Sequence, residues 1–406
     1  MKTLWIIGGP TASGKTSLGI DLALGLQTDI LSADARQFYR GMDIGTAKPS
    51  EQELSAVRHH FINSLELNDD YDLGRVFFHT GIKKMPAIET ARGQWLYDTT
   101  PTIQWFETVY PDISITPKSK ALSFISLLLE DYGDEWLWRP AMWWRWMPPI
   151  SRRALGTRIM RGALGAPALW WYFAQRQSRE WLWGDGMSKT NSDSIREMYF
   201  EELEFLESVF AKQPFILGSH PSAADFGYFA SMFRHFGNDP DPAEIMRARA
   251  PHTYAWLARL WDTKARDLGP TQKWVFPKGC HWTPLLDRIA NDYLPYLQAN
   301  AMAFRDGKKR FDFVGKNHTF RRTKTTFYRV WCLEVLQRHF RALNARERAR
   351  VDALFAPVGK ISKILSARPI SAEMDDLYDL PKPSLKGSHI TLTSPRGWRL
   401  GAQPRN

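Results

Sequence analysis

The first sixty residues alternate short apolar runs with amphipathic stretches. Leu18, Leu22 and Leu26 recur at the spacing of one helix face, so this stretch predicts a helix. Pro49 and Ser50 stand just before a second amphipathic stretch, a position typical of a helix start. The predicted order is a strand at 4–7, a helix at 15–26, a strand at 29–33 and a helix at 51–60.

A second group of short elements follows. Two short runs, at 87–89 and 95–97, flank an Ala-Arg-Gly-Gln sequence typical of a turn, so the pattern predicts a hairpin. The four residues from Asp98 to Pro101 are typical of a helix N-terminus. We expect that helix to run to Tyr110.

Helical patterns dominate most of the remaining chain. Strand signals are nearly absent from Lys118 to about Leu268, and a second mainly helical block runs from Lys278 to about Leu354. The tail from residue 367 is rich in Pro, Gly, Ser and Lys, so we expect it to be mostly disordered.

Five of the 18 tryptophans fall in one segment, 136–146 (WLWRPAMWWRW). The segment is too short to span a bilayer and carries Arg139 and Arg145, so we expect a packed aromatic helix and no membrane partner. The two cysteines cannot form a disulfide framework, and no signal peptide is recognisable, so the expected location is the cytoplasm. Cys332 falls on the apolar face of a predicted helix, which favours a core thiol over a nucleophile.

The net charge of +11 is concentrated in one stretch. Residues 301–350 hold 14 Lys and Arg against 4 Asp and Glu. Such a block can attract phosphate or nucleic acid, or it can form a solvated basic face. No nucleic-acid-binding motif accompanies it, which favours the solvated face.

A glycine-rich motif, GPTASGKT, follows the first predicted strand and opens the first predicted helix. Its glycines allow backbone N–H groups to surround a phosphate, the helix dipole adds positive potential, and the lysine neutralises charge. The predicted phosphate-binding residues are Gly9, Thr11, Ala12, Ser13, Gly14, Lys15 and Thr16.

The motif continues into residues 32–49 (SADARQFYRGMDIGTAKP) and then into 59–62 (HHFI). Together these segments closely resemble the N-terminus of tRNA dimethylallyltransferases, which transfer a prenyl group from dimethylallyl diphosphate to an adenosine in the anticodon loop of tRNA. The resemblance implies that Lys15 and Thr16 face the diphosphate and its Mg²⁺. It implies that Asp34 is the general base on the adenine amino group.

This first resemblance covers residues 1 to about 76. Ala35 stands where family members usually have Ser, and Asn63 where they have Asp. The family's later Gly-Gly-Thr-Gly-Leu-Tyr segment and its tRNA-binding insertion have no counterpart in this sequence. Those parts close the channel that excludes water and positions the tRNA base, so prenyl transfer is kept as an alternative function.

A second resemblance follows the first. Met85-Pro86, the predicted hairpin and Asp98-Thr99 resemble the second half of the thioredoxin-like domain of glutathione transferases. In that family a cis-proline leaves the backbone of the preceding residue free to bind the cysteinyl group of glutathione, which implies these roles for Pro86 and Met85. Asp98 and Thr99 would hold the γ-glutamyl carboxylate at a helix N-terminus, where the helix dipole favours an anion.

The helical part of the chain extends the second resemblance to about residue 355. The sequence 218–226 (GSHPSAADF) resembles the family's N-capping box, with Ser222 and Asp225 as its members. The sequence 328–332 (YRVWC), with the basic strand before it, resembles the C-terminal extension of one divergent branch.

The thiol-activating residue of that family lies in its first strand–helix turn, which the glycine-rich motif replaces here. Thr11, Ser13 and Thr16 occupy the analogous turn. A thiol with a pKa of about 8.5 needs a hydrogen-bond donor to ionise at neutral pH.

Each motif also has a purely structural interpretation. Pro86 can be an ordinary turn proline, and Asp98-Thr99 can be only a helix cap. His59-His60 is more often a solvated pair than a metal site, because no Cys or acidic ligands stand at a fixed spacing from it. The capping box is structural in either case.

The two resemblances can be combined, because a thioredoxin-like domain runs βαβα and then ββα. We predict an α/β N-terminal layer, in which a P-loop βαβα is joined to a thioredoxin-like ββα and strand 4–7 lies beside the 87–97 hairpin. A mainly α-helical, glutathione-transferase-like domain and a disordered tail follow. The rival account is a recombined or misassembled gene with its junction at 72–84. The predicted segments are 1–76 (P-loop), 77–117 (thioredoxin-like half-domain), 118–275 (helical domain), 276–366 (basic helical extension) and 367–406 (tail).

Three functions are compatible with this pattern. The leading one is a glutathione-transferase-like protein with a substituted N-terminal half-domain and weak or altered activity, which takes glutathione as substrate. A homodimer is compatible with it, and the sequence does not decide the oligomeric state. The second is prenyl transfer from a diphosphate small molecule to tRNA, with Mg²⁺ at the P-loop. The third is a non-catalytic module that binds a phosphate or a partner protein.

Overall fold

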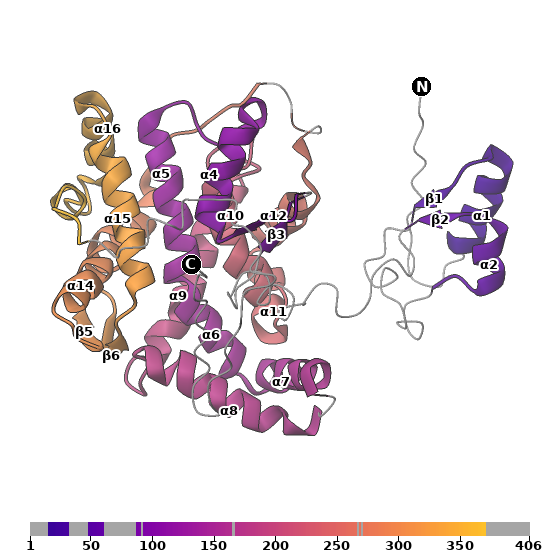
Figure 1. Ribbon diagram of the computed structural model, residues 1–406, viewed down its shortest axis with the longest axis horizontal. Helices are drawn as coiled ribbons and strands as arrows, with labels where there is room; N and C mark the ends of the chain where they lie inside the picture. Colours follow the sequence, from indigo (N-terminus) through magenta and orange to yellow (C-terminus); the bar gives the residue numbers. More distant parts are fainter. Residues whose placement is uncertain are drawn as a thin grey trace, which may run out of the picture. The chain divides into compact units, whose positions relative to one another are not determined.

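The computed structural model describes residues 15–31, 48–60, 87–90, 92–164, 167–265, 268 and 271–370. The chain divides into two compact units, 1–85 with 384–406, and 86–383 (Figure 1). Strand 4–7 and the tail beyond residue 370 lie outside the described residues, so the predictions for them stay predictions.

The described residues of the first unit, 15–31 and 48–60, form two helices and a short parallel sheet. Its elements are α1 (Lys15–Leu26), β1 (Ile30–Leu31), α2 (Glu51–Ala56) and β2 (His59–His60). Strand β1 pairs with β2, Ile30 opposite His59. The predicted start of α2 is confirmed, because Ser50 and Glu53 form a capping box. Its predicted end at residue 60 is wrong: Val57 is already extended and buried, and the two histidines form β2.

Helix α1 has the predicted bounds but buries a different face. Its buried residues are Ile20 and Ala23, which pack with Val57. The leucines that predicted the helix, at 18, 22 and 26, are exposed by 51%, 36% and 49%. Hydrophobic spacing therefore identified the helix correctly, whereas the apolar face it defines does not form the core of this unit.

The second unit begins with the predicted hairpin. Strand β3 (Ala87–Glu89) pairs antiparallel with β4 (Trp95–Tyr97), and the turn between them contains Gly93 at φ 72°. Strand β4 is buried at all three residues, and α4 (Thr99–Val109) follows it directly. Among the described strands, β3 pairs with β4 and β1 with β2. The combined sheet predicted for the N-terminal layer therefore stays a prediction.

The rest of the second unit is mainly helical, in agreement with the sequence pattern. Single π-helical turns continue α5, α10 and α13 at 132–136, 232–236 and 289–293, and short 3₁₀ turns lie at 111–113, 167–169, 183–185 and 280–282. The helices are α5 (Lys120–Asp131), α6 (Trp138–Trp146), α7 (Pro149–Leu164), α8 (Trp170–Trp181), α9 (Ser192–Phe210), α10 (Ala223–Ser231), α11 (Pro240–Arg249), α12 (Pro251–Asp262), α13 (Thr283–Arg288), α14 (Leu294–Arg305), α15 (Phe327–Arg341), α16 (Ala345–Phe355) and α17 (Ser362–Leu365).

Helices α5 and α10 pack closely at the centre of this unit. A Cβ atom on Gly227 would lie 2.3 Å from the backbone oxygen of Glu130, and one on Gly133 would lie 2.8 Å from the backbone nitrogen of Tyr228. Two glycines thus let the helices approach until their backbones nearly touch. The helical run from α5 to α6 is interrupted here, because residues 132–136 form a π turn around this contact.

The tryptophan-rich segment packs as predicted. Trp136, Trp144 and Trp146 are buried in the main hydrophobic core, which extends from Ala121 to Leu365. No helix among the described residues is long and apolar enough to cross a membrane.

The basic extension shares this core. A basic hairpin of β5 (Arg310–Val314) and β6 (Thr319–Lys324) lies between α14 and α15. Phe313 and Phe320 of the hairpin and Trp331 of α15 are buried in the same core as the helices before residue 275. The segments predicted at 118–275 and 276–366 are therefore parts of one packed unit.

Candidate functional site

The phosphate motif contributes two described residues, Lys15 and Thr16, in the first turn of α1. This position suits a P-loop lysine and hydroxyl, because the N–H groups of a helix N-terminus point toward a bound phosphate. Outside the described residues lie Gly9, Thr11, Ala12, Ser13, Gly14 and Asp34. Their predicted roles stay predictions.

The candidate glutathione-binding residues lie at the N-terminus of α4. Asp98 occupies the N-cap position at φ 70°, and Thr99 is the first helical residue. The Asp98 side chain forms no capping hydrogen bond, so the first-turn N–H groups of α4 are not covered by a capping carboxylate. A left-handed φ is uncommon for a residue other than glycine and marks a position held by its surroundings. Met85 and Pro86 lie outside the described residues.

The second residue of α4 is tied to helix α5. The Thr100 hydroxyl donates to Oε1 of Glu130 at 2.7 Å, and Glu130 is 1% exposed. Burial, with the nearby charge of Asp131, raises the pKa of Glu130 well above its usual range. This shift favours a neutral carboxyl. A neutral Glu130 would not repel an anion bound at the start of α4.

A second carboxyl lies beside Glu130. Loss of hydration raises the pKa of Asp131 to about 7, although the hydroxyl of Tyr293 donates to it. Cys332 also contacts Asp131, and burial, with the charge of Asp131, raises the pKa of this thiol well above its usual range. A thiolate is therefore disfavoured at Cys332, and the prediction of a buried core thiol is confirmed.

The capping box is fully buried at the start of α10. One carboxylate oxygen of Asp225 accepts from the backbone N–H and the hydroxyl of Ser222, at 2.9 and 3.0 Å. The other accepts from the backbone N–H of Ile216 at 2.9 Å and from Nε1 of Trp256 at 3.1 Å. Burial raises the pKa of Asp225 to about 6, so the group is still mainly ionised at neutral pH, where four donors compensate its charge. The box thus joins three elements as well as starting a helix.

The described residues contain no group of His, Cys, Asp and Glu that could hold a metal ion. His59 directs Nδ1 to the backbone oxygen of Val57 at 2.8 Å and is only partly exposed, so a local backbone contact replaces the solvated ring expected from the sequence. Cys280 is an exposed free thiol.

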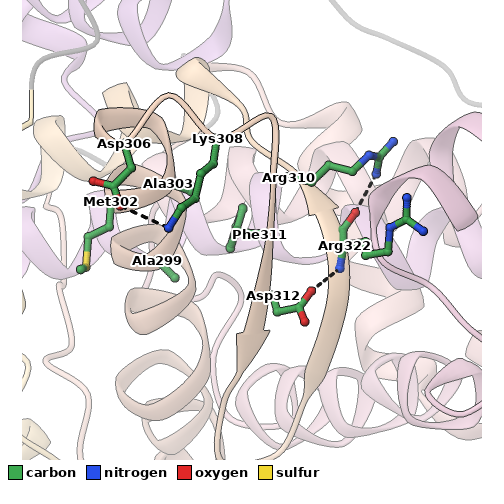
Figure 2. A pocket seen from close by; sticks show the side chains of 9 residues that line it. All are labelled: Ala299, Met302, Ala303, Asp306, Lys308, Arg310, Phe311, Asp312 and Arg322. Atoms are coloured by element: carbon green, nitrogen blue, oxygen red, sulfur yellow. Dashed lines mark hydrogen bonds and ion pairs between the residues drawn. The ribbon is translucent and has the colours of Figure 1, made fainter.

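A cavity of about 480 Å³ lies between the end of α14 and the basic hairpin (Figure 2). Lys308 contacts Asp306 at 3.4 Å, and Asp312 accepts from the backbone N–H of Arg322 at 2.7 Å. Arg310 donates to two backbone oxygens. Lys308 and Arg310 of this cavity therefore already have partners, which supports the prediction of a solvated basic face over a phosphate site.

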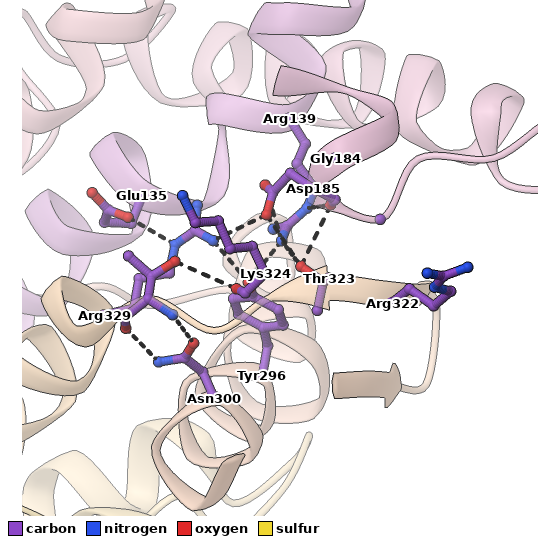
Figure 3. A network of polar contacts seen from close by, with 12 residues as sticks. Glu135, Arg139, Gly184, Asp185, Tyr296, Asn300, Arg322, Thr323, Lys324 and Arg329 are labelled. Carbon is purple, nitrogen blue, oxygen red and sulfur yellow. Dashed lines mark hydrogen bonds and ion pairs between the residues drawn. The ribbon is translucent and has the colours of Figure 1, made fainter. Parts of the chain in front are cut away.

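A polar network fastens the extension to the helices before it (Figure 3). The hydroxyl of Tyr296 accepts from Arg139 at 2.7 Å and from Arg329 at 2.8 Å. Asp185 lies 3.2 Å from Arg139 and 3.6 Å from Arg329. No local pattern predicts this network, because its contacts join residues 33 to 157 positions apart in the sequence.

Two family models match separate segments of the chain. The model of IPP transferase matches residues 37–94, which include α2, β2 and β3. The model of the glutathione S-transferase C-terminal domain matches residues 166–259, which include α8 to α11 and the capping box. The chain resembles both families. Both predicted resemblances are thus confirmed.

Curated relatives match the first of these families. The tRNA dimethylallyltransferase of Francisella tularensis subsp. novicida (strain U112) is 37% identical over 120 residues, which is 30% of this chain and 38% of the relative. That of Chlorobium phaeobacteroides (strain DSM 266 / SMG 266 / 2430) is 48% identical over 73 residues, 18% of this chain and 23% of the relative. The chain spans less than two fifths of the length of these relatives.

Proposed function

We propose that this protein is glutathione-transferase-like, with a P-loop segment in place of the first half of the thioredoxin-like domain, and that its transfer activity is weak or altered. The observation that carries the proposal is the buried capping box of Ser222 and Asp225, which lies inside the segment matched by the glutathione S-transferase C-terminal domain. This box and the helices around it supply the scaffold against which α4 packs.

The chemistry assigned to α4 is anion binding. The first-turn N–H groups of Thr99 and Thr100 and the positive end of the helix dipole would receive the γ-glutamyl carboxylate of glutathione. The raised pKa of Glu130 keeps negative charge away from that position. The Asp98 carboxylate would accept from the α-ammonium group of the same γ-glutamyl unit.

Weak activity follows from the missing thiol activator. The glutathione thiol needs a donor near its sulfur to ionise at neutral pH. The candidates from the sequence, Thr11, Ser13 and Thr16, belong to the glycine-rich motif that is predicted to bind phosphate. Met85 and Pro86, proposed to contact the cysteinyl group, would orient the thiol without lowering its pKa.

Retention of the full chain on immobilised glutathione tests this proposal. We expect retention that Asp98→Ala abolishes, because the variant removes the carboxylate that would accept from the α-ammonium group of glutathione. Asp98→Gly is the sharper variant, since glycine adopts φ 70° without strain and so removes the carboxylate alone. Asp112→Ala, an exposed aspartate beyond the other end of α4, is the matched control. Failure of the unaltered protein to bind, or equal binding by Asp98→Gly, would refute the proposal.

Prenyl transfer to tRNA is the second candidate, and the IPP transferase match favours it. We expect at most a trace of prenylated adenosine in tRNA from cells whose only source of this activity is the present chain, because the chain spans so little of those relatives. Mass spectrometry of the tRNA nucleosides measures it. Clear prenylation that Lys15→Ala abolishes and Lys212→Ala preserves would replace the leading proposal with this one. If both functions fail, a non-catalytic phosphate- or protein-binding module is what the two segments still support.

A further inference from the structure

Helices α7 and α8 form a hairpin at one edge of the second unit, at the bottom of Figure 1. The two helices are in close contact, since a Cβ atom on Gly156 of α7 would lie 3.0 Å from the backbone oxygen of Trp170. The buried residues of α8, Ala174 and Ser178, lie one helical turn apart and define its inner face. The opposite face of α8 is therefore its outer face.

Large apolar side chains are exposed along this hairpin. Trp171 and Tyr172 of α8 are 53% and 59% exposed. Ile150 at the start of α7 is 65% exposed, and Leu169, just before α8, is 44% exposed. Exposed apolar residues in such number on one hairpin mark an interaction surface more often than chance exposure does.

The same hairpin is strongly basic. Helix α7 has four arginines and no acidic residue, and α8 has two arginines and one glutamate. Five of the arginines are exposed, and among the residues that the structure describes none of them forms an ion pair with a carboxylate. These are Arg153, Arg158, Arg161, Arg176 and Arg179.

Aromatic rings and guanidinium groups share the outer face of α8. Tyr172 and Arg176 are four residues apart, and Arg179 follows three residues later, so their side chains lie on one side of the helix. Trp171 is also exposed, about 100° around the helix from Tyr172. This face combines rings that suit the boundary between water and hydrocarbon with cations that suit phosphate groups.

We propose that the α7–α8 hairpin docks on an anionic lipid bilayer. Its exposed arginines are complementary to acidic lipid headgroups, and its tryptophan, tyrosine and aliphatic side chains enter the interfacial layer. Ile150 and Leu169 favour lipid over nucleic acid, because bases stack on aromatic faces and gain little from aliphatic side chains. The docking is peripheral, so it differs from the absence of a membrane partner expected from the sequence, which rested on the inability of one segment to span a bilayer.

Sedimentation of the full chain with vesicles tests the proposal. We expect binding to vesicles that contain phosphatidylglycerol, weaker binding at higher salt, and no binding to phosphatidylcholine alone. The double variant Arg176→Ala with Arg179→Ala should weaken binding about 25-fold, at about fivefold for each arginine near the surface. The double variant Trp171→Ala with Tyr172→Ala should weaken it by a similar amount, through loss of the interfacial rings.

Two controls separate this face from other exposed groups of the same kind. Trp261→Ala removes a tryptophan of α12 that is 70% exposed, and Arg346→Ala removes an exposed arginine of the basic 301–350 stretch. Both should leave vesicle binding unchanged. The proposal is overturned if the protein does not bind acidic vesicles, or if the controls weaken vesicle binding as much as the hairpin variants do. It is also overturned if the protein binds tRNA and the hairpin variants lose tRNA binding while they keep vesicle binding.

Discussion

Replacement of Asp225 by alanine is expected to lower the free energy of unfolding of the second unit by about 4 kcal/mol. The carboxylate accepts four hydrogen bonds, from Ser222 (two), Ile216 and Trp256, and neither Asp225 nor Ser222 is exposed. Alanine would leave these buried donors without their acceptor. Each such donor costs about 1 kcal/mol or more, because water cannot replace the lost partner.

Urea unfolding followed by tryptophan fluorescence measures this loss. Asn344→Ala is the matched control, since Asn344 and Glu347 form an exposed capping box of the same kind at the start of α16. There the cost should be about 1 kcal/mol, the ordinary value of an exposed cap. Equal losses in the two variants would show that burial does not increase the contribution of the α10 capping box to the free energy of unfolding.

The capping boxes were predictable because they are local. Ser222 and Asp225 are three residues apart, and the pairing depends only on the geometry of a first helical turn. The β3–β4 hairpin and the start of α4 were predictable for the same reason. In each case neighbouring residues carry the whole signal, so a sequence read in order is sufficient.

Long-range packing could not be predicted in this way. The leucines of α1 have helical spacing, but which face is buried depends on where Val57 and β1 pack. The sequence pattern predicted His59 and His60 as the end of a helix. In the structure they form strand β2, which pairs with Ile30 and Leu31. The residues next to 59–60 in sequence carry no signal for pairing with β1.

The candidate site shows the same division. The position of Asp98 and Thr99 at a helix N-terminus followed from a short motif, whereas the tie between Thr100 and Glu130 joins residues 30 apart in sequence. The pKa of Glu130 depends on that packing, because it is burial by α4 and α10 that removes water from the carboxyl. The position of the site could therefore be predicted from the sequence, whereas the charge state of Glu130 could not.

A buried ion pair at the centre of the helical core supports the other large prediction. Glu202 accepts from the hydroxyls of Tyr132 and Tyr228, at 3.1 and 2.7 Å, and from Arg288 at 2.9 Å. The carboxylate is fully buried and Arg288 is 5% exposed. Glu202→Gln is expected to lower the free energy of unfolding by about 3 kcal/mol, because among the described residues the buried guanidinium then keeps only the more distant, partly exposed carboxylate of Glu201, at 3.8 Å.

A double-mutant cycle tests whether Glu202 and Arg288 stabilise the fold as a pair or independently. Arg288→Met should cost about 3 kcal/mol by itself, since it leaves the carboxylate without its counter-ion. The variant carrying both changes should lose about 2 kcal/mol less than the sum of the two single losses, because neither charge then remains alone in the core. Urea unfolding of the four proteins gives this coupling energy directly. Strict additivity would mean that the tyrosine hydroxyls, rather than Arg288, balance the charge of Glu202.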